Sequence, residues 1–298
     1  MKRLIKSGHS VDVVVRASSN LDVLRDVLPK IRVHIYDGEY ETLRHALEVS
    51  KPELVCHVAS LFLAKHKSED VARLVESNLN FPLQLLEAMN ALGIKKFLNT
   101  GTSWQHYNDD DYNPVNLYAA TKHAFESLLR YYSEAEGLSL ITLKLFDTYG
   151  PGDMRPKLFS LLRRTASTGI PLSMSPGQQL LDLVYIDDVL DAYLLAMARI
   201  ADIGRHESFA VGSSHRISLR ELVKIYGEIV GRPVPVEWGG QAYRLREVLI
   251  PWNGDCLPGW KAKISLPEGI KMMEMDPMVD GLLSGRKAHK LNDRGKKH

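Results

Sequence analysis

Tyr118 and Lys122 are the residues of this sequence whose types and spacing point most directly to chemistry. The chain after Pro114 has helical character, and helical side chains four residues apart lie one turn apart on the same face. A free phenol, with a pKa of about 10, is a poor base at neutral pH, but a nearby ammonium favours the phenolate. Such a pair can move a proton to or from a substrate oxygen. Thr102, at the end of a predicted strand, adds a hydroxyl that could hydrogen-bond the same oxygen.

This spacing carries little weight alone. The chain has 12 tyrosines, so a Tyr and a Lys four apart arise by chance about as often as not. Most such pairs are solvated helix faces. The elements around Tyr118 must therefore decide between the two interpretations.

The composition is that of an ordinary globular protein. The 298 residues are 45% hydrophobic and 25% charged, which fits one large or two small domains. Two cysteines are too few for a disulfide framework or a metal cluster, and Cys56 is expected to be a buried thiol because its neighbours are apolar. We therefore expect a reducing, cytoplasmic location and no bound metal. The apolar run at 54–64 is too short to span a bilayer and the start lacks a signal-peptide pattern, so no membrane association is expected.

The net charge of +2 is unevenly distributed. Residues 284–298 hold six Lys or Arg and one acid, which leaves −3 for the rest of the chain. The body is therefore not expected to bind nucleic acid. Residues 271–298 are expected to form a basic tail. From about Asp276 onward, the chain is not expected to be part of the folded body.

Predicted helices and strands alternate over the first half of the chain, which is typical of a doubly wound, parallel α/β sheet of the Rossmann type. The segment 54–60 is continuously apolar and is predicted to be a strand buried on both faces. The predicted helices are 2–6, 21–28, 40–50, 69–92 and 118–136, and the predicted strands are 11–16, 31–36, 54–60, 96–100 and 139–146.

A series of short motifs resembles the extended short-chain dehydrogenase/reductase family, in its NAD(P)-dependent nucleotide-sugar epimerase/dehydratase branch. The likeness covers about residues 1–270. The motifs that carry it are Asp37-Gly38, Cys56-His-Val-Ala-Ser60, the helix from Asn78, Thr100-Gly-Thr102, Tyr118-x3-Lys122, Tyr149-Gly-Pro151, Val184-Tyr-Ile-Asp-Asp-Val189 and the segment 257–270.

One part of the family pattern is not found. The family begins with a strand and a Gly-rich turn, whose amides and following helix hold the cofactor pyrophosphate. No such pattern precedes Val11. We therefore expect a truncated or mis-started form of a longer enzyme, one that binds NADP weakly at best.

The resemblance implies a set of cofactor-binding residues. Arg16, at the place of an acidic residue that binds the NAD ribose, favours NADP over NAD, although it could be an ordinary surface residue. The other implied cofactor contacts are Asp37, Gly38, Val58, Ala59, Ser60, Asn78, Tyr118, Lys122 and Phe146. Val58 and Ala59 could instead be plain core, and Asn78 a helix start.

The implied substrate contacts are Thr102, Asp147, Thr148 and Arg244. Asp147 stands where the family has Asn, and Lys144 and Leu181 replace two arginines, which puts the sugar contacts in doubt. Arg246 is a rival for Arg244, and both could belong to a surface loop paired with Glu247.

Other polar residues near these motifs are assigned no chemistry. His57 is expected to be a hydrogen-bonded core histidine, and His106 a solvated loop histidine. Asp109, Asp110 and Asp111 are expected to form a hydrated loop, since consecutive residues cannot all face one ion.

The resemblance implies transfer of a hydride between C4 of a nucleotide-linked hexose and nicotinamide. Tyr118 moves the hydroxyl proton, Lys122 tunes Tyr118 and holds the cofactor ribose, and Thr102 orients the C4 oxygen. Dehydration is disfavoured, because Ser103 and Trp104 stand where dehydratases carry an acidic pair. The 16-residue spacing from Thr102 to Tyr118 is similar to the CDP-abequose synthase type of 4-ketoreductase. 4-Keto-6-deoxy sugar reduction, 4-epimerisation and a non-catalytic, cofactor-sensing or scaffold role remain open.

The expected organisation has three parts. A nucleotide-binding domain covers 1–148 plus 183–212, a substrate lobe covers 149–182 plus 213–270, and 271–298 is the tail. The resemblance also implies a homodimer, in which the helices at 69–92 and 118–136 pair with their copies. Leu128, Leu129, Tyr131 and Tyr132 are expected to supply its apolar surface.

Overall fold

The computed structural model describes residues 1–153, 157–203 and 205–275. The chain divides into two compact units. Unit 1 comprises Met1–Thr100, Ala120–Thr142 and Arg199–Glu207, and unit 2 comprises Gly101–Ala119, Leu143–Ala198 and Ser208–His298. The predicted basic tail at 271–298 begins too early, because 271–274 belong to a helix whose Met273 is 3% exposed in a core. The rest of that tail, from Asp276, lies outside the described residues.

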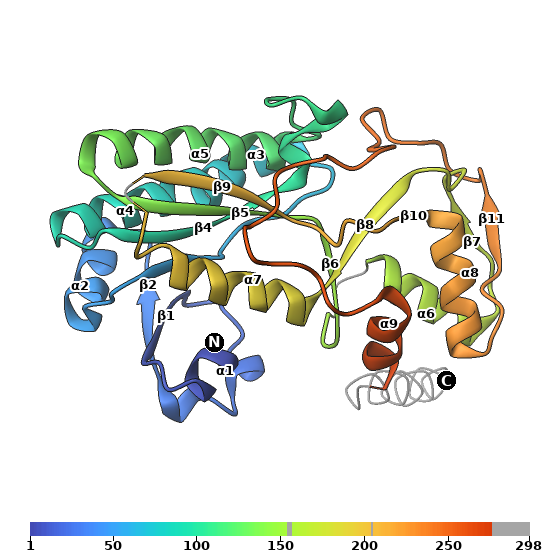
Figure 1. Ribbon diagram of the computed structural model, residues 1–298, viewed down its shortest axis with the longest axis horizontal. Coiled ribbons are helices and arrows are strands. Elements are labelled where there is room, and N and C mark those ends of the chain that lie inside the picture. The colour runs from blue at the N-terminus through green and yellow to red at the C-terminus, as the bar shows by residue number, and fades with distance from the viewer. Residues whose placement is uncertain (154–156, 204, 276–298) are drawn as a thin grey trace, which may run out of the picture. The chain divides into compact units, whose positions relative to one another are not determined.

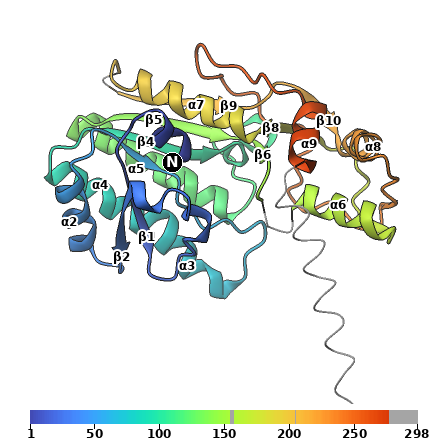
Figure 2. The same ribbon diagram turned by 90° about the horizontal axis from the view of Figure 1, so that it is seen from below.

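Unit 1 contributes strands to two separate sheets. Strand β1 (Val11–Arg16) pairs in parallel with β2 (Ile31–Tyr36), and the two lie side by side as a separate ladder in Figures 1 and 2. A four-stranded sheet has the order β3-β4-β5-β9, with bounds Val55–His57, Lys96–Thr102, Ser139–Leu145 and His206–Val211. Parallel neighbours need crossover connections, and helices provide them here. The predicted α/β class is confirmed.

The helices of unit 1 follow the predicted ones closely. Helix α1 (Lys2–Lys6), α2 (Tyr40–Ser50) and α5 (Leu117–Glu136) lie within a residue or two of the expected bounds. The predicted long helix is built from η3 (Ser68–Asp70), α3 (Val71–Val75), the π-helical turn η4 (Glu76–Asn80) and α4 (Phe81–Ala91). Pro82 has no N–H to give to the carbonyl of Asn78, so the regular α-helical bonding pattern is interrupted there.

The core of unit 1 joins these helices to the strands. Figure 1 shows α4 and α5 running along the strands. Their buried side chains, together with those of α2, form one cluster that includes Leu43, Leu86, Met89, Phe97 and Phe125. Each is exposed to 1% or less, so the implied active-site helix α5 rests on a closely packed support.

The predicted helix at 21–28 is wrong. The chain there forms two short 3₁₀ turns, Asp22–Leu24 and Leu28–Lys30. Asn20 accepts a hydrogen bond from the Asp22 N–H at 2.8 Å, which starts a local turn. Pro29 lies in the second turn, and proline disfavours an α-helical residue before it.

The predicted strand at 54–60 is too long, and Cys56 is exposed rather than buried. Strand β3 is at the edge of its sheet and has one neighbour, so it is covered less than a central strand. The chain leaves the sheet after His57. The Asn78 side chain then satisfies the Leu61 backbone, accepting from its N–H at 2.8 Å and donating to its carbonyl at 3.1 Å.

Unit 2 contains the three-stranded sheet β10-β8-β6, with bounds Arg216–Ser218, Leu180–Tyr185 and Asp147–Tyr149. Strands β7 (Leu172–Met174) and β11 (Val236–Trp238) form a second, parallel pair. The helices are α6 (Leu158–Thr168), α7 (Ile186–Arg199), α8 (Leu219–Val230) and α9 (Leu266–Glu274). A core that includes Phe159, Leu162, Tyr226 and Ile270 holds them together. No helix among the described residues is both long and apolar enough to cross a membrane.

Candidate active site

Thr102 ends strand β4 and is 9% exposed. It caps the short turn Ser103–Gln105: its Oγ1 accepts from the Trp104 N–H at 3.3 Å, and Gln105 Oε1 accepts from the Thr102 N–H at 3.0 Å. Thr-x-x-Gln is a capping-box pattern, so this structural role was readable in the sequence. The Thr102 side chain is thus fixed in place, while its hydroxyl hydrogen can still be donated to a substrate oxygen.

Tyr118 and Lys122 both lie in the first two turns of α5. The Asn116 side chain accepts from the Ala119 N–H at 2.9 Å, which explains why the helix begins here. Tyr118 is half-buried, whereas Lys122 is 2% exposed. Burial lowers the pKa of Lys122 to about 8, and the charge of Glu126 opposes this. The helix therefore holds a phenol and a buried amine one turn apart.

Asn78 connects three segments near Lys122. Its side chain is 1% exposed and accepts from Ser60 Oγ at 3.2 Å as well as from Leu61. Its amide nitrogen also donates to Thr121 Oγ1 at 3.0 Å. Asn78 is not the start of a helix but part of the π-helical turn, where it ties the segment after β3 to α5.

Arg16 and Asp37 each lie at or just after the end of a strand. The Arg16 N–H donates to Ser19 Oγ at 3.1 Å in a turn, and its side chain is exposed. The Asp37 carboxylate accepts from the Glu39 N–H at 3.0 Å and from Thr42 Oγ1 at 2.8 Å, and these bonds lower its pKa. The Gly38 carbonyl accepts from the Tyr36 hydroxyl at 3.0 Å, so this turn is held by several bonds.

His57 and the residues after it differ in exposure. His57 is 2% exposed and its Nδ1 lies 3.0 Å from Asn99 Oδ1, which confirms the predicted core histidine. Val58 is 60% exposed, and Ala59 and Ser60 are exposed as well. Val58 and Ala59 are thus not core. An accessible segment directly after β3 fits the cofactor contact that the resemblance implies.

The implied substrate residues of unit 2 are Asp147, Thr148 and Arg244. Asp147 has an accessible surface, but the protein packed around its carboxylate removes part of the water shell, and this desolvation raises its pKa. The charges of Lys157 and Arg244 oppose the rise. Thr148 Oγ1 donates to the Phe146 carbonyl at 3.3 Å. Arg244 makes a bidentate pair with Glu247, at 2.9 and 2.7 Å. This is the loop ion pair that the sequence allowed as an alternative.

His106 is not a solvated loop histidine, contrary to expectation. It is 6% exposed, and its Nε2 lies 2.9 Å from Nζ of the buried Lys144. The Trp252 ring stacks on it at 4.0 Å with an interplanar angle of 13°. Lys144 also lies over Trp252, 5.4 Å from the ring centroid. Nothing in the local sequence of His106 indicates this cluster, because its partners come from distant segments.

The loop 103–113 is further attached to the loop 243–253 in unit 2. Arg244 lies over the Trp104 ring at 5.4 Å, and Arg246 lies over Tyr107 at 4.4 Å while donating to Asn113. Asp109 accepts from the Asn253 N–H at 2.7 Å. These contacts fix the segment that follows Thr102. Asp109, Asp110 and Asp111 are exposed, and no cluster of three metal-ligating side chains occurs among the described residues.

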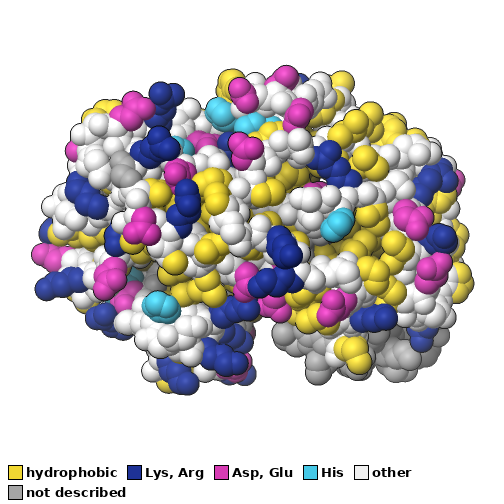
Figure 3. Space-filling view, viewed as in Figure 1, with side chains coloured by type: hydrophobic (Ala, Val, Ile, Leu, Met, Phe, Trp, Pro, Cys, Tyr) yellow, Lys and Arg dark blue, Asp and Glu magenta, His cyan; other side chains and the backbone are white. Residues whose placement is uncertain are grey.

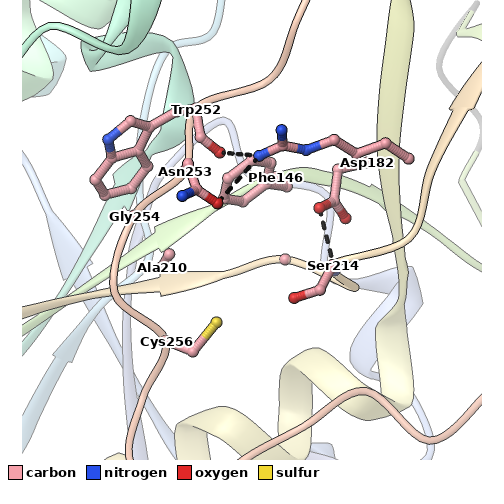
Figure 4. Close-up of a pocket in the computed structure, with 10 residues that line it drawn as sticks. Phe146, Asp182, Ala210, Ser214, Trp252, Asn253, Gly254 and Cys256 are labelled. Carbon is pink, nitrogen blue, oxygen red and sulfur yellow. Dashed lines mark hydrogen bonds between the residues drawn. The ribbon is translucent and has the colours of Figure 1, made fainter.

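A cavity of about 270 Å³ in unit 2 was not foreseen from the sequence. Figure 4 shows Phe146, Trp252 and Asp182 around it. Asp182 is held by Ser213 and Ser214, whose N–H groups donate to its two oxygens at 2.6 and 3.2 Å. Arg216 donates to the Trp252 carbonyl at 3.0 Å. Phe146, which the resemblance assigns to the cofactor, therefore also lines this cavity.

Hydrophobic side chains gather over β8, β10 and α8 in Figure 3. Leu245, Leu249 and Ile250, in the loop that carries Arg244, are exposed to 98%, 51% and 64%. This loop presents apolar side chains to solvent beside its charged pair.

Comparison with known proteins gives concordant results. The model of the NAD dependent epimerase/dehydratase family matches residues 1–212. CDP-abequose synthase of Yersinia pseudotuberculosis is 29% identical over 215 residues, which cover 71% of this chain and 74% of that protein. CDP-abequose synthase of Salmonella typhimurium is 26% identical over 284 residues, or 91% of each chain.

Among solved structures, UDP-glucose 4-epimerase of Thermotoga maritima, crystallised with UDP-glucose, superposes with a TM-score of 0.79. The match covers 91% of this chain and 92% of that one at 24% identity, so it supports the fold alone. The family match covers more than half of the chain and includes Thr102, Tyr118 and Lys122. The chain therefore belongs to the NAD-dependent epimerase/dehydratase family, as its motifs implied.

Proposed function

We propose that this protein reduces the C4 carbonyl of a nucleotide-linked 4-keto-6-deoxy sugar with NADPH. The observation that carries the proposal is Lys122: a buried amine with a pKa of about 8, on one helix with Tyr118. A buried cation at this position acts on the phenol and has N–H groups to give to a ribose. The likeness to CDP-abequose synthases supports reduction over epimerisation.

The cofactor supplies a hydride to the C4 carbon when bound. Tyr118 donates its phenolic proton to the C4 oxygen, so the carbonyl becomes an alcohol, and solvent reprotonates the phenolate. Lys122 stabilises the phenolate while it exists. Thr102 donates a hydrogen bond to the same oxygen and fixes its direction.

The preference for NADPH rests on Arg16. No ion pair with a described residue involves its guanidinium, and it is exposed at the end of β1. A guanidinium of this kind can make a bidentate pair with a 2′-phosphate. Changing Arg16→Asp should raise the KM for NADPH and lower it for NADH, whereas Arg25→Asp, at another exposed arginine, should change neither.

Arg244 is proposed to contact the substrate diphosphate. It already forms a pair with Glu247, so binding requires the guanidinium to exchange or share this partner. Asp147, next to these charges, is proposed to accept hydrogen bonds from sugar hydroxyls. A carboxylate cannot donate as the family Asn does, which selects a sugar with a donor at that position.

The deciding experiment is an assay with a 4-keto-6-deoxy sugar nucleotide and NADPH at saturating concentration, because weak NADP binding is expected. The proposal expects one NADPH consumed for each sugar reduced. The alternative is 4-epimerisation, which the same three groups could perform and which a UDP-glucose 4-epimerase relative, 24% identical, makes worth testing. Interconversion of two sugars with no net NADPH consumption would show that alternative. Binding without turnover of any sugar would indicate a scaffold.

The protein is proposed to act as a cytoplasmic homodimer. Helix α5 runs beside the α3–α4 segment, since Asn78 contacts Thr121 at one end and Asn90 contacts Glu136 at the other. Outward-facing Tyr131 is 57% exposed. Such a two-helix face suits pairing with a second copy.

A further inference from the structure

His57 is enclosed by aromatic rings in unit 1. Phe97 stacks on it at 5.8 Å, Phe125 meets it edge-on at 5.4 Å, and Phe81 lies 6.1 Å away. Burial lowers its pKa to about 3, and the charge of Lys122 adds to this effect. The ring is therefore neutral at physiological pH and can use one nitrogen as a donor and the other as an acceptor.

A hydrogen-bonded chain across the sheet determines which nitrogen carries the proton. Asn99 lies 3.0 Å from His57 Nδ1 through its Oδ1, and its amide nitrogen donates to Thr142 Oγ1 at 3.3 Å. Thr142 Oγ1 in turn lies 3.0 Å from His206 Nε2. An amide oxygen only accepts, so Nδ1 of His57 is the donor. Its Nε2 must then present a lone pair.

That lone pair is buried and has no hydrogen-bond partner among the described residues. Lys122 lies one helical turn before Phe125, whose ring meets His57, and it is likewise buried, with three N–H donors on a flexible stem. Glu126, four residues further along α5, also acts on Lys122 through its charge. The region thus holds an unused acceptor and a cation that burial makes less stable.

We propose that His57 is a positioning residue for Lys122: its Nε2 accepts a hydrogen bond from one water molecule, which in turn accepts a hydrogen bond from the Lys122 ammonium. This holds the ammonium toward Tyr118 and stabilises it against the loss of water. The inference rests on the proposed function for the role of Lys122 in the reaction. The hydrogen bond itself does not depend on which sugar is reduced.

The test uses His57→Phe, which keeps a ring in the aromatic cage, and His57→Gln, whose amide group can replace the Nε2 acceptor. The Lys122 pKa is followed by NMR of the ε-carbon and ζ-nitrogen of labelled lysine in the full chain. We expect His57→Phe to lower this pKa by about one unit, because the ammonium loses its acceptor. His57→Gln should restore at least half of the difference. His45→Phe, at an exposed histidine of α2, is the matched control and should leave it unchanged.

Nitrogen NMR of His57 tests the tautomer separately. The proposal expects a protonated Nδ1 and a bare Nε2; the opposite tautomer would overturn it, as would an unchanged Lys122 pKa in a folded His57→Phe. If His57→Phe does not fold, Asn99→Leu removes the partner of Nδ1 and should shift the tautomer and lower the Lys122 pKa. Because these readings need no turnover, an inactive protein with the expected shifts would count against the proposed function alone.

Discussion

The Tyr118 phenol is the single group whose removal should affect the reaction most. Tyr118→Phe keeps the ring and its place on α5 but cannot move a proton. We expect kcat to fall about 10²–10⁴-fold, the usual contribution of a positioned acid or base, with substrate affinity nearly unchanged. Single-turnover kinetics beside calorimetric binding will measure both. Tyr40→Phe, at a half-buried tyrosine outside the site, is the control. A variant that keeps a tenth of its activity would exclude Tyr118 as the proton donor.

The buried charge of Lys122 is expected to lower the free energy of unfolding, although the proposed reaction requires this residue. Its pKa is about 8 in the folded protein, below the ordinary value of 10.5, so the buried charge is unfavourable at neutral pH. We expect Lys122→Met to abolish turnover and yet raise the free energy of unfolding by about 2–3 kcal/mol at pH 7. Urea unfolding at several pH values measures this change.

The difference between Lys122→Met and the natural protein should depend on pH in a defined direction. Between pH 8 and 10.5 the unfolded chain binds more protons at Lys122 than the folded chain, so the stability of the natural protein rises with pH in this window and the difference shrinks. Lys65→Met, at an exposed lysine, should change little throughout. A difference that does not vary with pH would contradict this account.

At the scale of elements, Asn78 should be critical because it joins the segment after β3, the π-helical turn and α5. Asn78→Ala leaves the Leu61 amide and carbonyl without their partner, and we expect a loss of about 2–4 kcal/mol in thermal or urea unfolding. Asn80→Ala, in the same turn, removes bonds only to the exposed Glu76 and should cost much less. Equal losses for the two variants would contradict the critical role of Asn78.

Glu274 attaches α9 to two other helices of unit 2. It forms a bidentate pair with Arg163 of α6 at 2.9 and 3.0 Å, and accepts from the Tyr226 hydroxyl of α8 at 3.0 Å. Removing it leaves an arginine that is 17% exposed without this partner. We expect Glu274→Ala to lower the free energy of unfolding by about 1–3 kcal/mol, less than for a fully buried pair because water reaches the site. Lys271→Ala on the same helix is the control.

At the scale of the molecule, the outward faces of α3 and α5 should hold two copies together. Val71, Val75 and Tyr131 are exposed to 40%, 44% and 57%. Leu129 and Tyr132, which were expected to contribute, are instead buried in the core at 0% and 3%. We expect a dimer by light scattering at micromolar concentration and a monomer for Tyr131→Arg. Ile170→Arg, at an exposed residue of unit 2, should leave the mass unchanged. A monomeric natural protein would refute the proposal.

The sequence by itself determined what depends on nearby residues. Local periodicity predicts the bounds of α2 and α5, and with them the place of Tyr118 and Lys122 on one helix. A turn residue, Gly93 with φ of +70°, predicts the end of the long helix. The Thr-x-x-Gln pattern likewise predicts the capping box that Thr102 and Gln105 form. The family motifs added the membership in the NAD-dependent epimerase/dehydratase family.

Only the tertiary structure decided the properties that depend on distant neighbours. Cys56 is exposed because β3 lies at a sheet edge, although its neighbours in sequence are apolar. His106 is buried because Lys144 and Trp252, remote in the chain, meet it. His57 could be recognised as a core residue, but its link through Asn99 and the effect of the Lys122 charge on it required the folded chain. The exposure of a residue and the charges near it depend on all the segments that pack around it. A local sequence pattern describes only one of these segments.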